Sequence, residues 1–358
     1  MQKADGINYA PVSVAPVNKV VSEGEFCFAA VGLDHGHIYA MCNGLLEAGA
    51  TLRFVYDPDP KKVEAFLSRY PNTPVASSAQ QVLDDPHISL VASAVIPCDR
   101  TSLGLQVLNA GKHYFTDKPG MTTFEQLAQV REAVQRTGKR YFIYFGERLH
   151  VEAAVYVQQM IDQGLLGRVL QVTILAPHRL AAPTRPDWFF DPNRCGNILL
   201  DIGSHQYEQF LSYTGAESAE VIHSQMANYE NKEHPGFADY GDVILKADNG
   251  ATGFFRLDWF TPDGMGAWGD GRVFLVGTKA TVEIRKYIDL AVSSEGDHVL
   301  FTDSTGEHRM DVYGKVGFPF FGQMIRDCLD GTETAMTQAH IFESMRLALE
   351  ASSTASWL

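Results

Sequence analysis

The sequence predicts an α/β protein in which a doubly wound parallel sheet precedes an α+β domain with an open, largely antiparallel sheet. Three observations predict it. Phe26 to Val31 is apolar throughout, as in a strand buried on both faces of a parallel sheet. Apolar strands then alternate with amphipathic helices up to about residue 148, which is typical of βα units. From residue 149 onward, strands follow one another across hairpin turns.

The first domain is predicted over residues 26–148. Apolar runs predict its strands, and its helices end at stop signals such as Gly49, Gly111 and Pro86. After the first strand we expect strands at Thr51–Tyr56, Thr73–Ala76, Ile88–Ile96, His113–Thr116 and Tyr141–Phe145. The expected helices cover Ile38–Ala48, Pro60–Arg69, Ser78–Leu83, 98–110 and Thr122–Arg136.

The second domain is predicted over residues 149–358. Asp248-Asn249-Gly250 and Gly277-Thr278-Lys279 are hairpin-turn signals that separate its strands. We expect strands at Arg168–Ala176, Glu220–Met226, Asp242–Ala247, Ala251–Phe260, Arg272–Val276 and Ala280–Arg285, with weaker ones near Leu290, Val299 and Arg309–Val312. Helices are expected at Val151–Gln163, Asn197–Tyr213, Gly322–Cys328 and Gln338–Ser352, and the closing helices (322–352) are expected to pack back on the first domain.

Composition excludes several classes of partner. The 358 residues carry a net charge of −14, which disfavours nucleic acid and anionic membrane surfaces as partners. No segment is apolar over the ~18 residues that a membrane helix needs. Five cysteines without CxxC spacing favour free thiols and a cytoplasmic location. Residues 1–25 lack an apolar signal core and are expected to form an N-terminal arm or a disordered tail.

A glycine turn follows the first strand. Strand, glycine turn and helix together point backbone N–H groups and a helix dipole at a phosphate. The match to GxGxxG is imperfect, because Asp34 and His37 stand at two of the three glycine positions. The turn consists of Gly32, Leu33, Asp34, His35, Gly36 and His37, and by itself it is weak evidence for dinucleotide binding.

Asp57 ends the second strand and lies 25 residues beyond Gly32. A carboxylate at about this offset accepts hydrogen bonds from the adenosine ribose and repels a 2′-phosphate, so it favours NAD over NADP. Lys61 and Lys62 follow closely and leave NADP open. The alternative is a turn aspartate in the sequence DPDP.

Other polar residues fall at or just beyond the carboxyl ends of predicted strands, where ligands bind in such sheets. They include Asp34, Asp57, Pro97, Lys118 and Glu147. The ammonium of Lys118 could polarise a substrate oxygen and take part in proton transfer. An exposed loop lysine beside a turn proline is the alternative.

Asp201 and His205 are four residues apart and would share a face of one helix. One interpretation makes His205 a general base that Asp201 orients. The alternatives are a buried Asp–His pair between helix and sheet and a two-ligand metal site, for which this spacing also serves. Gly203 between them costs helix propensity and therefore indicates a close approach by backbone or ligand.

These motifs resemble the Gfo/Idh/MocA oxidoreductase family, named after glucose–fructose oxidoreductase, inositol dehydrogenase and a rhizopine-pathway enzyme. The resemblance spans residues 26–358. It depends on the glycine turn, on Asp117-Lys118-Pro119 where the family usually has EKP, on the DxGxH motif at Asp201–His205, and on the final helix. Asp117-Lys118-Pro119 and the DxGxH motif form an ordered pair roughly 80 residues apart, which is a strong signal for this family.

The resemblance implies a Rossmann domain, a second domain whose open sheet makes dimer or tetramer contacts, and NAD as the cofactor. It implies that Lys118, Asp201 and His205 form the catalytic set, and that Pro97 and Asp117 join the turn and Asp57 in binding the cofactor. It also implies an N-terminal arm that grips the cofactor or a neighbouring subunit. Asp34 departs from the pattern, because its charge would repel a diphosphate unless it turns away to cap the helix.

Several polar residues near the same regions are candidates for shaping a sugar pocket. The alternative for each is ordinary loop polarity. They are Arg148, His150, His178, Arg179, Trp188 and Arg194.

The predicted function is hydride transfer between NAD(P) and a secondary alcohol of a sugar, cyclitol or sugar acid, with no metal. The sequence is compatible with three alternatives. The first is a redox-neutral lyase or glycosidase that uses bound NAD. The second is a metal-dependent hydrolase that uses the turn Asp34-His35-Gly36-His37, which would require eight βα units. The third is a cofactor-sensing regulator without turnover.

Overall fold

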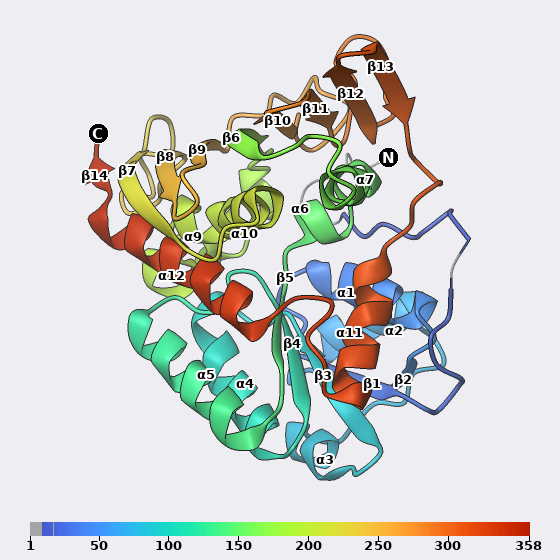
Figure 1. Ribbon diagram of the computed structural model, residues 1–358. Helices are drawn as coiled ribbons and strands as arrows, with labels where there is room; N and C mark the ends of the chain where they lie inside the picture. Colours follow the sequence, from blue (N-terminus) through green and yellow to red (C-terminus); the bar gives the residue numbers. More distant parts are fainter. Residues whose placement is uncertain (1–8, 17) are drawn as a thin grey trace. The chain divides into compact units, whose positions relative to one another are not determined.

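The structure is a computed structural model that describes residues 9–16 and 18–358 (Figure 1). The chain divides into two compact units. The N-terminal unit comprises Pro319–Phe342 and the described residues of Ile7–Tyr144. The C-terminal unit comprises Phe145–Phe318 and Glu343–Leu358. One parallel sheet and one mixed, mostly antiparallel sheet confirm the predicted fold class.

The N-terminal unit is built on a parallel five-stranded sheet with the order β2-β1-β3-β4-β5. All five residues of β1 are buried, as its apolar sequence predicts. Helices α4 and α5 lie on one side of this sheet, and α1, α2 and α11 lie on the other (Figure 1). The strands are β1 (Cys27–Val31), β2 (Thr51–Tyr56), β3 (Ile88–Ser93), β4 (His113–Asp117) and β5 (Tyr141–Tyr144). The helices are α1 (His37–Glu47), α2 (Pro60–Arg69), α3 (Ala79–Asp84), α4 (Arg100–Asn109), α5 (Phe124–Thr137) and α11 (Pro319–Asp330).

The helix boundaries follow from local capping chemistry. The side chains of Asp59, Ser78 and Thr123 each accept a hydrogen bond from a backbone N–H in the first turn of the helix that follows. A predicted strand at Thr73–Ala76 is wrong, because only an isolated bridge between Val55 and Val75 forms there. The segment is too short, and its Pro74 cannot donate to a ladder.

Part of the predicted N-terminal arm runs along α1. The amide of Asn43 donates to the backbone oxygens of Ala10 and Pro11 at 3.3 and 3.1 Å. The backbone N–H of Ser13 donates to Glu47 Oε1 at 2.9 Å. The rest of the arm's prediction, for residues 1–8 and 17, lies outside the described residues.

The C-terminal unit is built on a nine-stranded sheet with the order β13-β12-β11-β10-β6-β9-β8-β7-β14. Neighbouring strands are antiparallel except β6 with β9 and β14 with β7. Both predicted hairpins form, between β8 and β9 and between β10 and β11. The strands are β6 (Val169–Pro177), β7 (Ala219–Ala227), β8 (Tyr240–Ala247), β9 (Thr252–Asp258), β10 (Arg272–Gly277), β11 (Thr281–Arg285), β12 (His298–Asp303), β13 (Gly306–Asp311) and β14 (Ser356–Trp357).

Helix α10 packs on β6 and β9, and α7 packs on β11 and β12. Apolar side chains that remain exposed along the strands include Leu170, Ile222, Ile244 and Val276. The helices are α6 (Gly146–Leu149), α7 (Glu152–Asp162), α8 (Pro192–Cys195), α9 (Ile198–Asp201), α10 (Gly203–Thr214) and most of α12 (Gln338–Thr354). No helix within residues 9–16 and 18–358 combines the length and apolar character that crossing a membrane requires.

Two predictions for this unit are wrong in detail. Residues near Leu290 form no strand, only a bridge between Asp289 and Ser293. The helix predicted over Asn197–Tyr213 is divided at Ile202 into α9 and α10, although Ile202 itself has helical dihedrals. Gly203 does mark a close approach, but to the side chain of Leu257, which a Cβ would meet at 3.2 Å.

Candidate functional site

The turn after β1 requires glycine at its first position. Gly32 has φ +78°, and a Cβ there would lie 2.0 Å from Cγ1 of Val95. Its N–H donates to the backbone oxygen of Tyr56, and its carbonyl accepts from the N–H of Ala94. These bonds tie the end of β1 to the ends of β2 and β3. Gly36 is the N-cap of α1 and has no side chain to cap it, and the first-turn N–H groups of Ile38 and Tyr39 donate to the backbone oxygens of His35 and Gly36 at 3.3 and 3.1 Å.

Asp34 does not cap α1, which corrects the interpretation from sequence. Its carboxylate accepts from the ammonium of Lys62 on α2 at 2.6 Å. Lys62 was not expected to compensate this charge because it lies 28 residues away in the chain. Burial alone would lower the pKa of Lys62. The carboxylates of Asp34, Asp57 and Asp59 have the opposite and larger effect, so the pKa of Lys62 lies above its ordinary value. Lys62 is therefore an ammonium that partly neutralises the turn.

Asp57 has a structural function in the same turn. Its Oδ2 accepts from the backbone N–H of Leu33 at 2.7 Å, and its Oδ1 accepts from the N–H of Asp59 at 2.9 Å. The carboxylate thus joins the turn after β1 to the turn after β2. Each oxygen has a second lone pair, so the chemistry of Asp57 remains compatible with a ribose hydroxyl.

Asp117, at the end of β4, gathers four donors around one buried carboxylate. Its Oδ1 lies 2.8 Å from Nδ1 of His37 and accepts from the Lys118 N–H at 2.7 Å. Its Oδ2 lies 3.0 Å from Nδ1 of His35 and 3.1 Å from Nη2 of Arg100. Burial raises the pKa of Asp117, but His37, Arg100 and His35 lower it well below its ordinary value. Burial and the neighbouring His37 lower the pKa of His35 to about 4, so His35 is neutral at pH 7.

The same three side chains, His35, His37 and Asp117, are the one group within the described ranges 9–16 and 18–358 spaced to ligate a metal. The four donors already use the roughly four lone-pair sites of the Asp117 carboxylate. The cluster is therefore sufficiently explained as a clamp between the glycine turn and β4. The barrel that the metal-hydrolase alternative required is also contradicted, because the sheet beside this turn has five strands.

Arg100 completes this edge of the sheet. It is 1% exposed, and it donates to the backbone oxygens of Val95 at 2.8 Å and Pro119 at 3.0 Å as well as to Asp117. Pro97 begins the short 3₁₀ turn that directly precedes Arg100 in the chain, and its side chain is buried. Lys118, the predicted catalytic lysine, is 5% exposed. The structure thus gathers the glycine turn, Asp57 and Asp117 in one unit.

The predicted histidine lies in the C-terminal unit. His205 is 3% exposed in the first turn of α10, and Asp201 ends α9 one turn earlier. The two therefore belong to consecutive short helices rather than to one continuous helix. The ring of Phe145 lies edge-on to His205, with centroids 6.4 Å apart.

A buried carboxylate, Glu147 on α6, organises the surroundings of His205. Glu147 Oε2 accepts from the ammonium of Lys286 at 2.9 Å, and that ammonium also donates to Gln209 Oε1 at 2.8 Å. Gln209 donates in turn to the backbone oxygen of His205 at 3.1 Å. Burial raises the pKa of Glu147, but Lys286, His205 and His178 together hold it well below its ordinary value. Glu147 is therefore a permanent negative charge near His205.

His178 approaches Glu147 from the end of β6. Its Nε2 lies 3.6 Å from Oε1 of Glu147, and its Nδ1 lies 3.2 Å from the carbonyl oxygen of Ala176. A carbonyl only accepts, so Nδ1 carries a proton in this hydrogen bond. The rings of Trp268 and Trp259 lie 4.4 and 5.4 Å from the imidazole. His178 thus belongs to the same buried polar cluster.

Two predicted substrate arginines have structural partners. Arg148 forms a two-pronged pair with Glu208, with Nε 2.8 Å from Oε1 and 3.0 Å from Oε2. Arg179 donates to the backbone oxygens of Met265 at 2.7 Å and Ala267 at 3.0 Å. The first pair fastens α6 to α10, and the second set holds the loop after β9.

The remaining predicted substrate residues are dispersed within the unit. His150 is fully buried against the ring of Phe318 at 4.4 Å. Trp188 is half-buried in a 3₁₀ turn, and Arg194 is exposed on α8. The sequence did not indicate the roles of Arg100, Gln209 and Lys286, nor the pairing of Lys62 with Asp34. Their sequence surroundings resemble ordinary helix and strand-end polarity, so no local signal distinguishes them.

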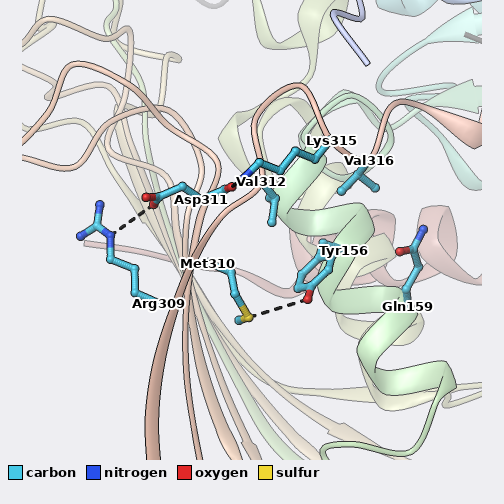
Figure 2. A pocket seen from close by; sticks show the side chains of 8 residues that line it. All are labelled: Tyr156, Gln159, Arg309, Met310, Asp311, Val312, Lys315 and Val316. Atoms are coloured by element: carbon cyan, nitrogen blue, oxygen red, sulfur yellow. Dashed lines mark hydrogen bonds and ion pairs between the residues drawn. The ribbon is translucent and has the colours of Figure 1, made fainter. Parts of the chain in front are cut away.

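A separate pocket of about 640 Å³ lies between α7 and the end of β13 (Figure 2). Tyr156 Oη lies 3.7 Å from the sulfur of Met310 across it, and Arg309 Nε donates to Asp311 at 3.2 Å. The lining residues include none of the predicted site residues. The cations here already pair with carboxylate or backbone oxygens, so the pocket offers no ready anion site.

Comparisons with known proteins agree with both units. Residues 29–145 match the model of an oxidoreductase family with an NAD-binding Rossmann fold, and residues 154–283 match the GFO/IDH/MocA C-terminal domain. A crystal structure from Erwinia carotovora atroseptica SCRI1043 is 46% identical, with a TM-score of 0.90 over 93% of this chain and 100% of that one. A levoglucosan dehydrogenase in complex with NADH and levoglucosan has a TM-score of 0.75 at 16% identity, over 92% of this chain and 97% of that one.

Three curated relatives match at 22–26% identity. Bacillus subtilis scyllo-inositol 2-dehydrogenase (NAD(+)) is 24% identical over 66% of this chain and 66% of its own length. Escherichia coli D-glucoside 3-dehydrogenase is 22% identical over 71% of this chain and 72% of its own length. An oxidoreductase of Schizosaccharomyces pombe whose activity is uncharacterised is 26% identical over 41% of this chain and 40% of its length. The chain thus covers between two fifths and about seven tenths of these relatives.

Proposed function

Because this chain belongs to the Gfo/Idh/MocA family of NAD-binding oxidoreductases, we propose that it is an NAD-dependent dehydrogenase acting on a secondary alcohol. The proposed substrates are sugars, cyclitols and sugar acids. The names of a scyllo-inositol 2-dehydrogenase and a D-glucoside 3-dehydrogenase among the relatives support this class. The observation that carries the proposal is the edge of the parallel sheet, where the Gly32 turn, Asp57 and Asp117-Lys118 follow three strands of one unit.

The N-terminal unit is proposed to hold the cofactor. The backbone of the glycine turn would receive the pyrophosphate at the start of α1, and Asp57 would face the ribose. The carboxylate of Asp117 contacts His37 of the turn and accepts from the backbone N–H of Lys118. Its proposed role is therefore to position the turn and the backbone of Lys118. The bound nicotinamide would supply hydride acceptance, and the chain's own residues would supply binding and proton transfer.

Three residues are proposed for proton transfer. The ammonium of Lys118 would donate a hydrogen bond to the substrate oxygen, and His205 would accept the hydroxyl proton as the carbinol hydride leaves. Asp201 would orient or assist His205. Glu147 would act through His205, because its fixed negative charge stabilises the imidazolium that forms.

Oligomeric state and location are also proposals. The exposed apolar side chains along the nine-stranded sheet support a dimer or tetramer formed through this face. The five free cysteines support a reducing, cytoplasmic location.

The test separates chemistry from binding. Lys118→Ala should abolish NADH formation from an active substrate while NADH still binds, as measured by fluorescence titration. His205→Gln should behave in the same way. The control is Lys61→Met, an exposed lysine that should leave both properties unchanged. Full turnover in Lys118→Ala would refute the catalytic assignment.

A further inference from the structure

We propose that Asp34 makes the adenosine end of the cofactor site selective for NAD over NADP, because it holds the Lys62 ammonium that would otherwise bind a 2′-phosphate. Asp34 thereby becomes a specificity-determining residue, although it occupies a glycine position of the dinucleotide turn. The inference depends on the NAD-binding part of the proposed function and not on the identity of the alcohol.

The location follows from the topology of the N-terminal unit. In a dinucleotide-binding sheet, the adenosine ribose lies at the carboxyl end of the second strand. Asp57 directly follows β2, and its Oδ2 accepts from the N–H of Leu33 at 2.7 Å. Asp34 is the next residue after Leu33, and its carboxylate lies 2.6 Å from Lys62 Nζ. The two carboxylates and the ammonium therefore form one cluster at the ribose end.

The charges of this cluster favour a ribose hydroxyl over a phosphate. Lys62 Nζ lies 2.6 Å from Asp34 Oδ1 and 3.9 Å from Asp57 Oδ1, so one ammonium faces two carboxylates. A 2′-phosphate would add about two further negative charges, whereas hydroxyls donate hydrogen bonds to carboxylates. The cluster as it stands should therefore repel NADP.

Lys62 is a latent phosphate ligand. Its side chain is 35% exposed, so it can reorient, and its raised pKa keeps it charged. Removing the carboxylate of Asp34 would leave Lys62 with Asp57 at 3.9 Å, outside hydrogen-bond distance. The freed ammonium could then pair with the 2′-phosphate.

Asp34 is a better test position than Asp57. Both oxygens of Asp57 accept backbone N–H groups that shape the two turns, so its loss would disturb the turn itself. The Asp34 side chain is 17% exposed, and its carboxylate accepts a hydrogen bond from the side chain of Lys62 rather than from a backbone N–H. Its replacement therefore changes charge with less effect on the backbone.

The experiment is a binding titration that needs no substrate. NADH and NADPH are titrated by fluorescence, and AMP and adenosine 2′,5′-bisphosphate are used as competitors that sample only this end of the site. The variants are Asp34→Ala, Asp34→Glu, Lys62→Met and the double variant Asp34→Ala/Lys62→Met, with Lys61→Met as the matched lysine control. Circular dichroism checks that each variant is folded.

The wild type should bind NADH at least about tenfold more tightly than NADPH, as one charge-assisted contact predicts. Asp34→Ala should reduce this ratio by about tenfold or more, and the effect should disappear in the double variant. Asp34→Glu and Lys61→Met should retain the wild-type ratio. A ratio that is unchanged in Asp34→Ala, or a gain that persists without Lys62, would overturn the proposal while leaving the dehydrogenase assignment intact. Failure of the wild type to bind either dinucleotide would overturn both.

Discussion

Replacing Glu147 by glutamine should reveal how strongly the buried charge cluster holds the C-terminal unit together. Glu147 and Lys286 are 4% and 2% exposed, and their charged atoms lie 2.9 Å apart. Glutamine keeps the shape and an amide oxygen that can accept from Lys286, but it removes the negative charge that pairs with the buried ammonium. Removing one partner of a buried ion pair costs about 3–5 kcal/mol, so we expect Glu147→Gln to lower the free energy of unfolding by that amount.

A double-mutant cycle separates this pair from general damage. Lys286→Met should cost a similar amount, because it strands the carboxylate near His178 at 3.6 Å. In the double variant neither charge is left unpaired, so its loss should be smaller than the sum of the single losses by at least ~2 kcal/mol. Urea unfolding followed by far-ultraviolet circular dichroism measures all four proteins. The exposed pair Arg326–Asp330 is the control, and Asp330→Asn should cost no more than about 1 kcal/mol.

The pH dependence gives the sign of the effect. The pKa of Glu147 is depressed in the folded protein, so its contribution is present above the ordinary value of 4.5 and is lost as the pH falls. The difference between the wild type and Glu147→Gln should therefore be largest near neutral pH and shrink in acid. Additive single losses, or a difference that does not depend on pH, would refute the assigned pairing.

Two other predictions concern stability. Gly32→Ala combines positive-φ strain with a 2.0 Å clash against Val95, whereas Gly111→Ala, at φ +76° with open space, adds only the strain. Urea unfolding should show that Gly32→Ala lowers the free energy of unfolding by ~1–3 kcal/mol more than Gly111→Ala does. Equal losses in the two variants would contradict the clash. Burial, aided by the nearby Glu152 carboxylate, raises the pKa of Asp297 to about 6, so protonated Asp297 stabilises the fold below pH 3.8 and this contribution is lost as the pH rises through 6. The free energy of unfolding of Asp297→Asn, measured relative to the wild type, should therefore rise by up to about 3 kcal/mol between pH 4 and pH 8. A difference between the two thermal melts that does not change with pH would exclude this.

The sequence was sufficient to predict the architecture because its strongest signals are local. The apolar run in β1, the glycine after it and the hairpin turns at Gly250 and Gly277 each act within a few residues. Thr73–Ala76 lies beside β2 but forms only the bridge between Val75 and Val55, because the segment is short and Pro74 has no N–H to donate.

The site was less predictable because its partners are distant in the chain. From the sequence Asp34 is an uncompensated charge in the turn. In the structure, α2 places Nζ of Lys62, which is 28 residues later in the chain, 2.6 Å from Oδ1 of Asp34. The Lys286–Glu147 pair joins residues separated by 139 positions, and Lys286 reads from sequence as an ordinary strand-end lysine. The helix expected to carry both Asp201 and His205 is divided at Ile202. The one sequence signal for this division is the neighbouring Gly203. Charge compensation of this kind is set by tertiary packing rather than by motif spacing.

The proposed dehydrogenase activity can be tested by measuring NADH formation when the purified protein is incubated with NAD⁺ and a panel of sugars, cyclitols and sugar acids. At least one of these alcohols should yield NADH and the corresponding ketone in equal amounts, and Lys118→Ala should lose this activity while still binding NADH. Product that accumulates without net NADH would instead indicate redox-neutral chemistry. A protein that binds neither NAD nor NADP would contradict the claim.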